Sequence, residues 1–303
     1  MKTYALVLTS SPAAPALTAE IVDRALAALS GSTRGETLWL SEHEAWQVQI
    51  SVSEPPDADQ FRATVAEALA NLPADVNVVP DDASRRKKLL VADMESTIIE
   101  QECLDELADH IGLRDRISEI TARAMRGEIA FEEALKERVR LLKGLKVDVL
   151  GNLYNRLTFM PGARELVATM RANGAYCALV SGGFTFFTER IAARLGFNLH
   201  RANTLEITNG RLAGTVGLPI LGREAKLQTL QELARDGSLQ PAETLAVGDG
   251  ANDLAMIQAA GLGVAFRAKP ILKERATASI VHGDLTALLY LQGYRREDFA
   301  PTL

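Results

Sequence analysis

The pattern of hydrophobic and polar positions divides the chain into two parts. In the first part, strand-like runs at residues 4–9, 36–40, 46–52 and 76–79 are interleaved with two amphipathic helices. The first helix follows the N-cap candidate Thr18, and the second covers residues 57–72. The resulting order, strand-helix-strand-strand-helix-strand, predicts a ferredoxin-like α+β domain over residues 1–82. Such a domain could regulate, sense an amino acid or form a homodimer, because fold alone assigns no ligand.

The second part, residues 83–303, follows a different pattern. A continuous apolar run at 89–92 is typical of a strand that is buried on both faces. Further strand signals at 176–180, 244–247, 263–266 and 279–281 alternate with helical patterns at 185–195, 223–234, 253–260, 270–276 and 285–291. This alternation predicts a Rossmann-like, doubly wound parallel sheet that binds its ligand beyond the carboxyl ends of the strands.

Three segments stand outside this alternation. Residues 101–156 are helical in pattern and follow the first strand directly, where they could act as a lid over the sheet. Residues 203–215 contain an Asn209-Gly210 pair that predicts a β-hairpin. The charged run DDASRRKK, after Pro80, is interpreted as a solvated linker between the two domains.

Composition and charge exclude several function classes. The 303 residues are 47% hydrophobic and 24% charged, as expected of globular domains, and the net charge of -6 provides no broad basic field for nucleic acid or an acidic membrane. No apolar stretch reaches the roughly 18 residues of a membrane span, and the apolar run near the N-terminus is too short for a signal peptide. Cys103 and Cys177 lack metal-ligand spacing and fit a reducing compartment, so we expect a cytoplasmic protein.

The segment VADMEST places Asp93 at the end of the first strand of the second domain. An isolated aspartate there is often a turn residue or a helix cap. An aspartate carboxylate can also attack phosphorus and form an acyl phosphate, provided that a metal ion neutralises the approach of two anions. Glu95, two residues further on, could protonate the leaving oxygen and then deprotonate water, and Thr97 could orient the site by a hydrogen bond.

The segment VGDGANDL brings a second group of polar residues to a strand end. Asp249 is the best candidate for a direct Mg²⁺ ligand, because magnesium prefers carboxylate oxygens and water. Asn252 and Asp253 open the next helix, and Asp253 could also serve only as a helix cap.

Two further segments offer phosphate contacts. In VSGGF, Ser181 ends a strand, and Gly182 and Gly183 would let backbone N–H groups approach a phosphate closely. Lys226 would most often be a solvated lysine, but beside these segments it could place a positive charge on phosphoryl oxygens.

The four segments in this order resemble the haloacid dehalogenase superfamily, and within it the phosphoserine phosphatases, over residues 85–295. The resemblance implies that Asp93 is the nucleophile and Glu95 the general acid/base. It implies that Mg²⁺ is held by Asp93, Asp249 and the backbone carbonyl of Glu95. The remaining implied roles are phosphate binding by Ser181, Gly182 and Lys226, substrate contact by Asn252, and support of the site by Thr97, Gly183 and Asp253.

The helical insert adds substrate candidates. Glu102 and Arg138 match the positions at which the family binds the ammonium and the carboxylate of O-phosphoserine, while Met125 and Phe131 could form apolar walls. On composition alone, Glu102 and Arg138 would be solvated surface charges.

One departure from the family pattern concerns the first motif, which normally reads DxDxT and here contains Glu95. The extra methylene can move the acid/base carboxyl by about an ångström. We expect Mg²⁺-dependent hydrolysis of O-phosphoserine, the last step of serine biosynthesis. Phosphotransfer from phosphoserine to homoserine and a catalytically silent amino-acid sensor remain the alternatives.

Overall fold

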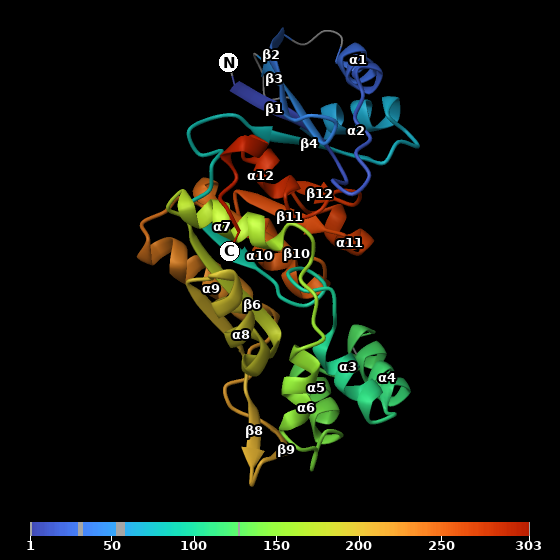
Figure 1. Cartoon of the computed structure of the whole chain (residues 1–303), viewed down its shortest axis with the longest axis vertical. Helices are drawn as coiled ribbons and strands as arrows, with labels where there is room; N and C mark the ends of the chain where they lie inside the picture. The colour runs from blue at the N-terminus through green and yellow to red at the C-terminus, as the bar shows by residue number, and fades with distance from the viewer. Residues whose placement is uncertain (1, 30–32, 53–57, 127, 303) are drawn as a thin grey trace.

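The computed structural model describes residues 2–29, 33–52, 58–126 and 128–302. Three regions follow one another along the long axis of the molecule (Figure 1). A small antiparallel sheet with two helices lies at one end, a parallel sheet flanked by helices lies in the middle, and a group of helices with a β-hairpin lies at the other end.

The N-terminal region has the predicted ferredoxin-like order. Its elements are β1 (Lys2–Ser10), α1 (Ala19–Ala28), β2 (Thr33–Ser41), β3 (Ala45–Val52), α2 (Ala58–Ala68) and β4 (Ala74–Pro80), and the antiparallel sheet has the order β2-β3-β1-β4. Thr18 caps α1 as expected, because its Oγ1 accepts the N–H of Ile21. Residue 57, the expected start of the second helix, lies outside the described residues.

The central region contains the predicted parallel sheet. Its strands are β5 (Leu89–Ala92), β6 (Tyr176–Phe184), β7 (Leu199–Asn203), β10 (Thr244–Gly248), β11 (Leu262–Phe266) and β12 (Ala278–Ile280). The sheet order is β12-β11-β10-β5-β6-β7, so β5 lies between β10 and β6, where the direction of strand addition reverses. This reversal is the topological switch point at which such sheets bind ligands.

Helices cover both faces of this sheet because successive side chains of each strand point to opposite faces. Leu89 and Val91 pack against α9 (Arg223–Asp236), α10 (Leu254–Ala259) and α11 (Pro270–Lys273). Leu90 and Ala92 pack on the other face, in the core shared with α7 (Ala163–Ala172), α8 (Thr185–Leu195) and α12 (Ala287–Leu291).

The insert after β5 forms the helical cap, with α3 (Cys103–His110), α4 (Arg114–Met125), α5 (Phe131–Arg140) and α6 (Asp148–Tyr154). The predicted hairpin is present as β8 (Leu205–Thr208) and β9 (Arg211–Val216). Its turn residues Asn209 and Gly210 have φ values of 51° and 72°, as a two-residue hairpin turn requires. The hairpin pairs with the cap, since Gly144 donates to Leu212 O at 2.8 Å and Leu212 donates to Leu145 O at 2.8 Å.

The junction between the N-terminal sheet and the central region is buried and polar. Asp75 of β4 is 5% exposed, and its carboxylate accepts the backbone N–H groups of Val281 and Gly283 at 2.8 Å each. The amide of Asn77 donates to Ser279 O at 3.1 Å. At this junction β4 contacts β12, and β1 contacts α12 (Figure 1).

The interpretation of residues 81–88 as a solvated linker is wrong for two side chains. Arg85 is 8% exposed, donates from Nε to Leu291 O at 3.0 Å and forms an ion pair with Asp81 at 2.9 Å. Lys87 is 7% exposed and donates from Nζ to the carbonyl of Ala242 at 2.7 Å. Because Arg85 also donates from Nη2 to Gln47 Oε1 of β3 at 2.7 Å, it links the antiparallel sheet to the segment around Leu291. A homodimer through residues 1–82 and amino-acid sensing by them stay predictions.

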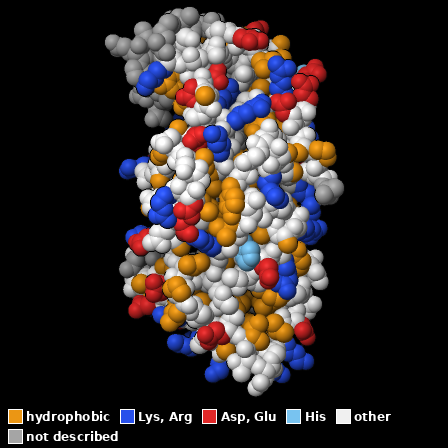
Figure 2. Space-filling view, turned by 90° about the vertical axis from the view of Figure 1, so that its left-hand side faces the viewer, with side chains coloured by type: hydrophobic (Ala, Val, Ile, Leu, Met, Phe, Trp, Pro, Cys, Tyr) orange, Lys and Arg blue, Asp and Glu red, His pale blue; other side chains and the backbone are white. Residues whose placement is uncertain are grey.

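On the face shown in Figure 2, basic and acidic side chains are interspersed and form no field of one charge sign. None of the helices in the described ranges combines the length and the apolar character that crossing a bilayer requires.

Candidate active site

A cavity of about 460 Å³ lies between the carboxyl ends of the central strands and the helical cap. Its volume falls within the usual range of small-molecule sites. The residues predicted for the site that line it are Asp93, Glu95, Glu102, Phe131, Arg138, Gly182, Gly183, Asp249 and Asn252. Strand ends and cap helices separated by more than 100 residues of sequence thus supply one pocket, as the motif pattern predicted.

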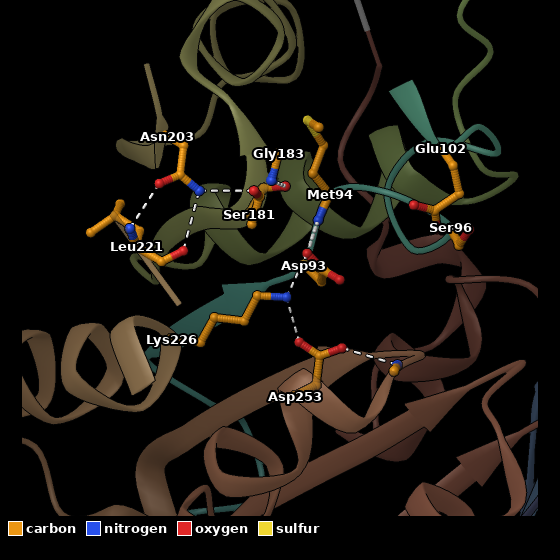
Figure 3. Close-up of polar contacts among 12 residues, drawn as sticks. Asp93, Met94, Ser96, Glu102, Ser181, Gly183, Asn203, Leu221, Lys226 and Asp253 are labelled. Atoms are coloured by element: carbon orange, nitrogen blue, oxygen red, sulfur yellow. Dashed lines mark hydrogen bonds and ion pairs between the residues drawn. The ribbon is translucent and has the colours of Figure 1, made fainter. Parts of the chain in front are cut away.

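The floor of the pocket contains a buried ion-pair cluster (Figure 3). Lys226 Nζ lies 2.7 Å from Asp93 Oδ1 and 2.6 Å from Asp253 Oδ1. The side chains of Lys226, Asp93 and Asp253 are 2%, 7% and 0% exposed, so each charge is stabilised by the others and not by water. Burial opposes the charge on Lys226, but the two carboxylates outweigh it and raise its pKa. Burial, and then repulsion from Asp253, raise the pKa of Asp93 well above its usual value.

The same cluster could hold a cation. Asp93, Asp249 and Asp253 each offer a carboxylate oxygen, and these oxygens lie within 4.8 Å of one another. Burial, and then Asp253, raise the pKa of Asp249 to about 6. Since one ammonium, Lys226, faces three carboxylates, the donor set has excess negative charge and hard oxygen ligands, as a divalent cation such as Mg²⁺ requires.

Glu95 is held between the sheet and the cap. Its Oε1 accepts the backbone N–H of Cys103 at 2.8 Å, and Cys103 is the first residue of helix α3. A carboxylate at this end of a helix is favoured by the helix dipole. Burial and then repulsion from Glu102 nevertheless raise the pKa of Glu95 to about 7, which suits a group that must both donate and accept a proton.

The Ser-Gly-Gly segment, predicted as a turn, forms the end of strand β6 and lies opposite Asp93 (Figure 3). Ser181 is 2% exposed, and its Oγ accepts the N–H of Gly183 at 2.9 Å. The amide of Asn203, at the end of β7, donates to Gly182 O at 2.9 Å and accepts the N–H of Leu221 at 2.8 Å (Figure 3). Asn203 therefore ties this segment to the residues that lead into the helix of Lys226. Asn203 was not among the predicted site residues, although it is the first residue of the predicted hairpin.

The cap contributes one anion and one cation to the pocket. Glu102 Oε1 accepts the hydroxyl of Ser96 at 2.7 Å. The guanidinium of Arg138 is half-buried and donates to Thr121 Oγ1 and to Ala134 O at 3.3 Å each. Burial lowers the pKa of Arg138, and among the described residues no carboxylate lies within ion-pair distance of it. Its charge is therefore available to a ligand.

The structure leaves some expected contacts unmade. Thr97 is fully buried and its Oγ1 has no hydrogen-bond partner among the described residues, so its predicted role in orienting the site stays a prediction. Met125 ends helix α4, and its side chain lies outside the described part of the chain. Lys269, which the sequence analysis missed, lines the pocket and donates its backbone N–H to Asp249 O at 3.2 Å. It follows strand β11, so its position after a strand end was a usable signal.

Comparisons with known proteins agree with this geometry. The model of the haloacid dehalogenase-like hydrolases matches residues 90–258. A phosphoserine phosphatase of Archaeoglobus fulgidus is 46% identical over 233 residues, which are 77% of this chain and 68% of that protein. A phosphoserine phosphatase of Streptomyces coelicolor is 40% identical over 270 residues, which are 89% of this chain and 66% of that protein. The chain thus spans about two thirds of the length of these two curated relatives.

A solved structure extends the similarity to the N-terminal region. The unliganded crystal structure of a probable phosphoserine phosphatase from Vibrio cholerae is similar with a TM-score of 0.76 and 30% identity. The similarity covers 98% of this chain and 88% of that chain. Because the family model covers more than half of the residues and the curated relatives are at least 40% identical, this chain belongs to the haloacid dehalogenase-like hydrolases.

Proposed function

We propose that this protein is a magnesium-dependent phosphoserine phosphatase that hydrolyses O-phospho-L-serine to L-serine and phosphate, the last step of serine biosynthesis. The observation that carries the proposal is the Asp93 carboxylate, held by Lys226 on the floor of a pocket that also contains Glu95 and an unpaired Arg138. The names of the relatives support the substrate, and the three-aspartate cluster supports the metal.

Two short contacts orient the carboxylate of Asp93, the proposed nucleophile. Asp93 Oδ1 accepts the N–H of Met94 at 2.7 Å and contacts Lys226 Nζ at 2.7 Å. Both contacts orient the carboxylate and leave Oδ2 with lone pairs for phosphorus or for the cation. Attack on phosphorus forms the Asp93 acyl phosphate and breaks the ester bond, while Glu95 donates its proton to the serine oxygen. Glu95 then accepts a proton from the water that hydrolyses the acyl phosphate and regenerates Asp93.

The cation would be held by Asp93, Asp249 and the backbone carbonyl of Glu95. When bound, it supplies the positive charge that lets an anionic carboxylate approach an anionic phosphate. Lys226, the Ser181 hydroxyl and the Gly182 N–H would bind the phosphoryl oxygens.

The cap would recognise the amino-acid part of the substrate. Arg138 offers a planar pair of donors that fits a carboxylate, and Glu102 offers an anion for the ammonium group. Phe131 would provide an apolar wall between them, since it lines the same cavity.

The test is phosphate release from O-phosphoserine by the wild type and by Asp93→Asn, each with Mg²⁺ and with excess EDTA. We expect turnover only in the wild type with Mg²⁺. Equal rates for the wild type and Asp93→Asn would refute the nucleophile, and full activity in EDTA would refute the metal dependence. A panel with phosphothreonine and phosphohomoserine measures how strictly the pocket selects the branching and length of the phosphorylated side chain, since all three compounds carry the groups proposed to bind Arg138 and Glu102.

The extra methylene of Glu95 favours one second candidate, transfer of the phosphoryl group from phosphoserine to another alcohol. If the acyl phosphate reacts with an alcohol instead of water, homoserine added to the assay will divert phosphate into a new ester. An unchanged yield of free phosphate at saturating homoserine removes this candidate.

A further inference from the structure

The room for a glutamate at position 95 comes from a glycine on the neighbouring strand. A Cβ atom placed on Gly183 would lie 2.9 Å from Glu95 Oε2 and 3.1 Å from both Oε1 and Cδ. Non-bonded carbon atoms do not approach a carboxyl group this closely without displacing it. The carboxyl of Glu95 therefore occupies the space that a side chain on Gly183 would take.

The carboxyl is also held from the opposite side. Its Oε1 accepts the backbone N–H of Cys103 at 2.8 Å, and Cys103 is 0% exposed at the start of α3. The end of a glutamate side chain is flexible, so a methyl group on Gly183 could push it aside at small cost in stability. The displaced carboxyl would lose its bond to Cys103 and its position over the substrate, so the cost would fall on catalysis.

We infer that Gly183 determines which acid/base residue fits at position 95. Glutamate fits at 95 because Gly183 has no side chain, and an alanine at 183 would require the shorter aspartate at 95. This inference rests on the proposed function, because it takes Glu95 to be the group that transfers the proton. Gly183 itself acts through Glu95 and is a positioning residue.

An alanine at 183 is a clean steric probe. Gly183 does not have a positive φ, so alanine can adopt its backbone conformation. Alanine also keeps the backbone N–H that donates to Ser181 Oγ at 2.9 Å. The substitution therefore adds a methyl group without removing a hydrogen bond.

The experiment is a double-mutant cycle with wild type, Gly183→Ala, Glu95→Asp and the double variant, assayed for kcat and KM on O-phosphoserine. A displacement of about an ångström costs on the order of 100-fold in rate, so we expect Gly183→Ala to lower kcat by roughly that factor when Glu95 is present. In the Glu95→Asp background the same substitution should cost only a few-fold, and KM should change little in either background. Gly217→Ala is the matched control, because its Cβ would meet only Thr204, at an ordinary 3.6 Å, and kcat should stay at the wild-type value.

A second substrate separates this role from a role in phosphate binding. The leaving group of p-nitrophenyl phosphate departs without a proton, so the burst of nitrophenolate should survive in Gly183→Ala while turnover of phosphoserine falls. A loss of the nitrophenolate burst as large as the loss of phosphoserine turnover, or an equal loss from Gly183→Ala in both backgrounds, would overturn the inference.

A crystal structure of Gly183→Ala tests the inference independently of activity. We expect the Glu95 carboxyl to be displaced and its bond to Cys103 N–H broken, and an unmoved carboxyl would overturn the inference. Failure of the wild type to hydrolyse phosphoserine would instead refute the proposed function, so the two failures are distinguishable.

Discussion

Removing Lys226 should destabilise the fold far more than removing an exposed lysine that forms an equally short ion pair. In Lys226→Met, the carboxylates of Asp93 and Asp253, which are 7% and 0% exposed, lose the ammonium that lies 2.7 Å and 2.6 Å from them. Breaking a buried ion pair by deleting one partner costs about 3–5 kcal/mol, because the remaining charge stays buried and uncompensated. We expect a decrease of this size in the free energy of unfolding at neutral pH.

The matched control is Lys88→Met. Lys88 Nζ lies 2.6 Å from Glu243 Oε1, but the two side chains are 63% and 19% exposed. Exposed pairs of this kind contribute at most about 1 kcal/mol, because water screens them. Since the two lysines have nearly equal ion-pair distances, the difference between the two variants measures the effect of burial together with that of the second carboxylate beside Lys226.

The pH dependence of the Lys226→Met variant supplies a second criterion. Without Lys226, the pKa of Asp93 in the folded state should rise further, because the cation that lowers it is gone. A folded protein whose carboxyls have raised pKa values binds protons more tightly than the unfolded chain, so its stability increases as the pH falls towards the ordinary aspartate pKa near 3.8. The cost of the substitution should therefore be smaller at about pH 5 than at about pH 8.

The assay is urea unfolding followed by intrinsic fluorescence, in EDTA, at both pH values for the wild type and both variants. The reasoning is refuted if Lys226→Met costs no more than Lys88→Met, or if its cost is the same at both pH values.

Three further predictions concern the pocket. Arg138→Lys should raise KM for phosphoserine at least about tenfold while p-nitrophenyl phosphate turnover changes little, because a single ammonium cannot replace the paired donors of the guanidinium. Equal KM values for wild type and variant in steady-state kinetics would contradict this. Asn203→Leu should lower the free energy of unfolding by about 2–3 kcal/mol and should lower kcat, because Gly182 O and Leu221 N–H lose their hydrogen bonds to Asn203. Chemical denaturation and steady-state kinetics check this, and a stability loss below about 0.5 kcal/mol would contradict it. Burial and then the negative charge of Glu102 raise the pKa of Glu95 to about 7, so Glu102→Gln should move the corresponding limb of the pH–rate profile to lower pH. An unmoved limb would contradict a contribution from Glu102.

The parts of the site that could be predicted from sequence are those that local patterns determine. Asp93, Ser181 and Asp249 each follow an apolar run, and the carboxyl ends of parallel strands meet at one edge of a sheet. Their convergence on one pocket region therefore followed from three local signals. The type I′ turn at Asn209-Gly210 was likewise readable, because few residues tolerate its backbone conformation.

Contacts between distant parts of the chain were harder to predict from the sequence. Arg85 and Lys87 lie in a charged run that looks solvated, and they are buried because their side chains donate to the carbonyl groups of Leu291 and Ala242, which are 206 and 155 residues away along the chain. A pattern confined to neighbouring residues cannot show which side of such a run will meet another domain. The same holds for Asn203, whose partners Gly182 and Leu221 are 21 and 18 residues away along the chain.

Other omissions had a signal that was not used. Helix α7 was not predicted, although Leu166, Val167 and Met170 are buried at helical spacing. Strand β6 extends to Phe184, beyond the predicted end at residue 180, because the Ser-Gly-Gly segment continues in an extended conformation before α8. That extension is what brings Gly183 beside Glu95.

The most direct measurement of the proposed chemistry is to trap the phosphorylated enzyme. Turnover of O-phosphoserine with Mg²⁺ is quenched with borohydride, which reduces an aspartyl phosphate to homoserine, and the peptides are mapped by mass spectrometry. We expect homoserine at position 93 in the wild type and none in Asp93→Asn. Reduction at any other carboxyl group, or at none while phosphate is being released, would contradict a mechanism in which Asp93 attacks phosphorus.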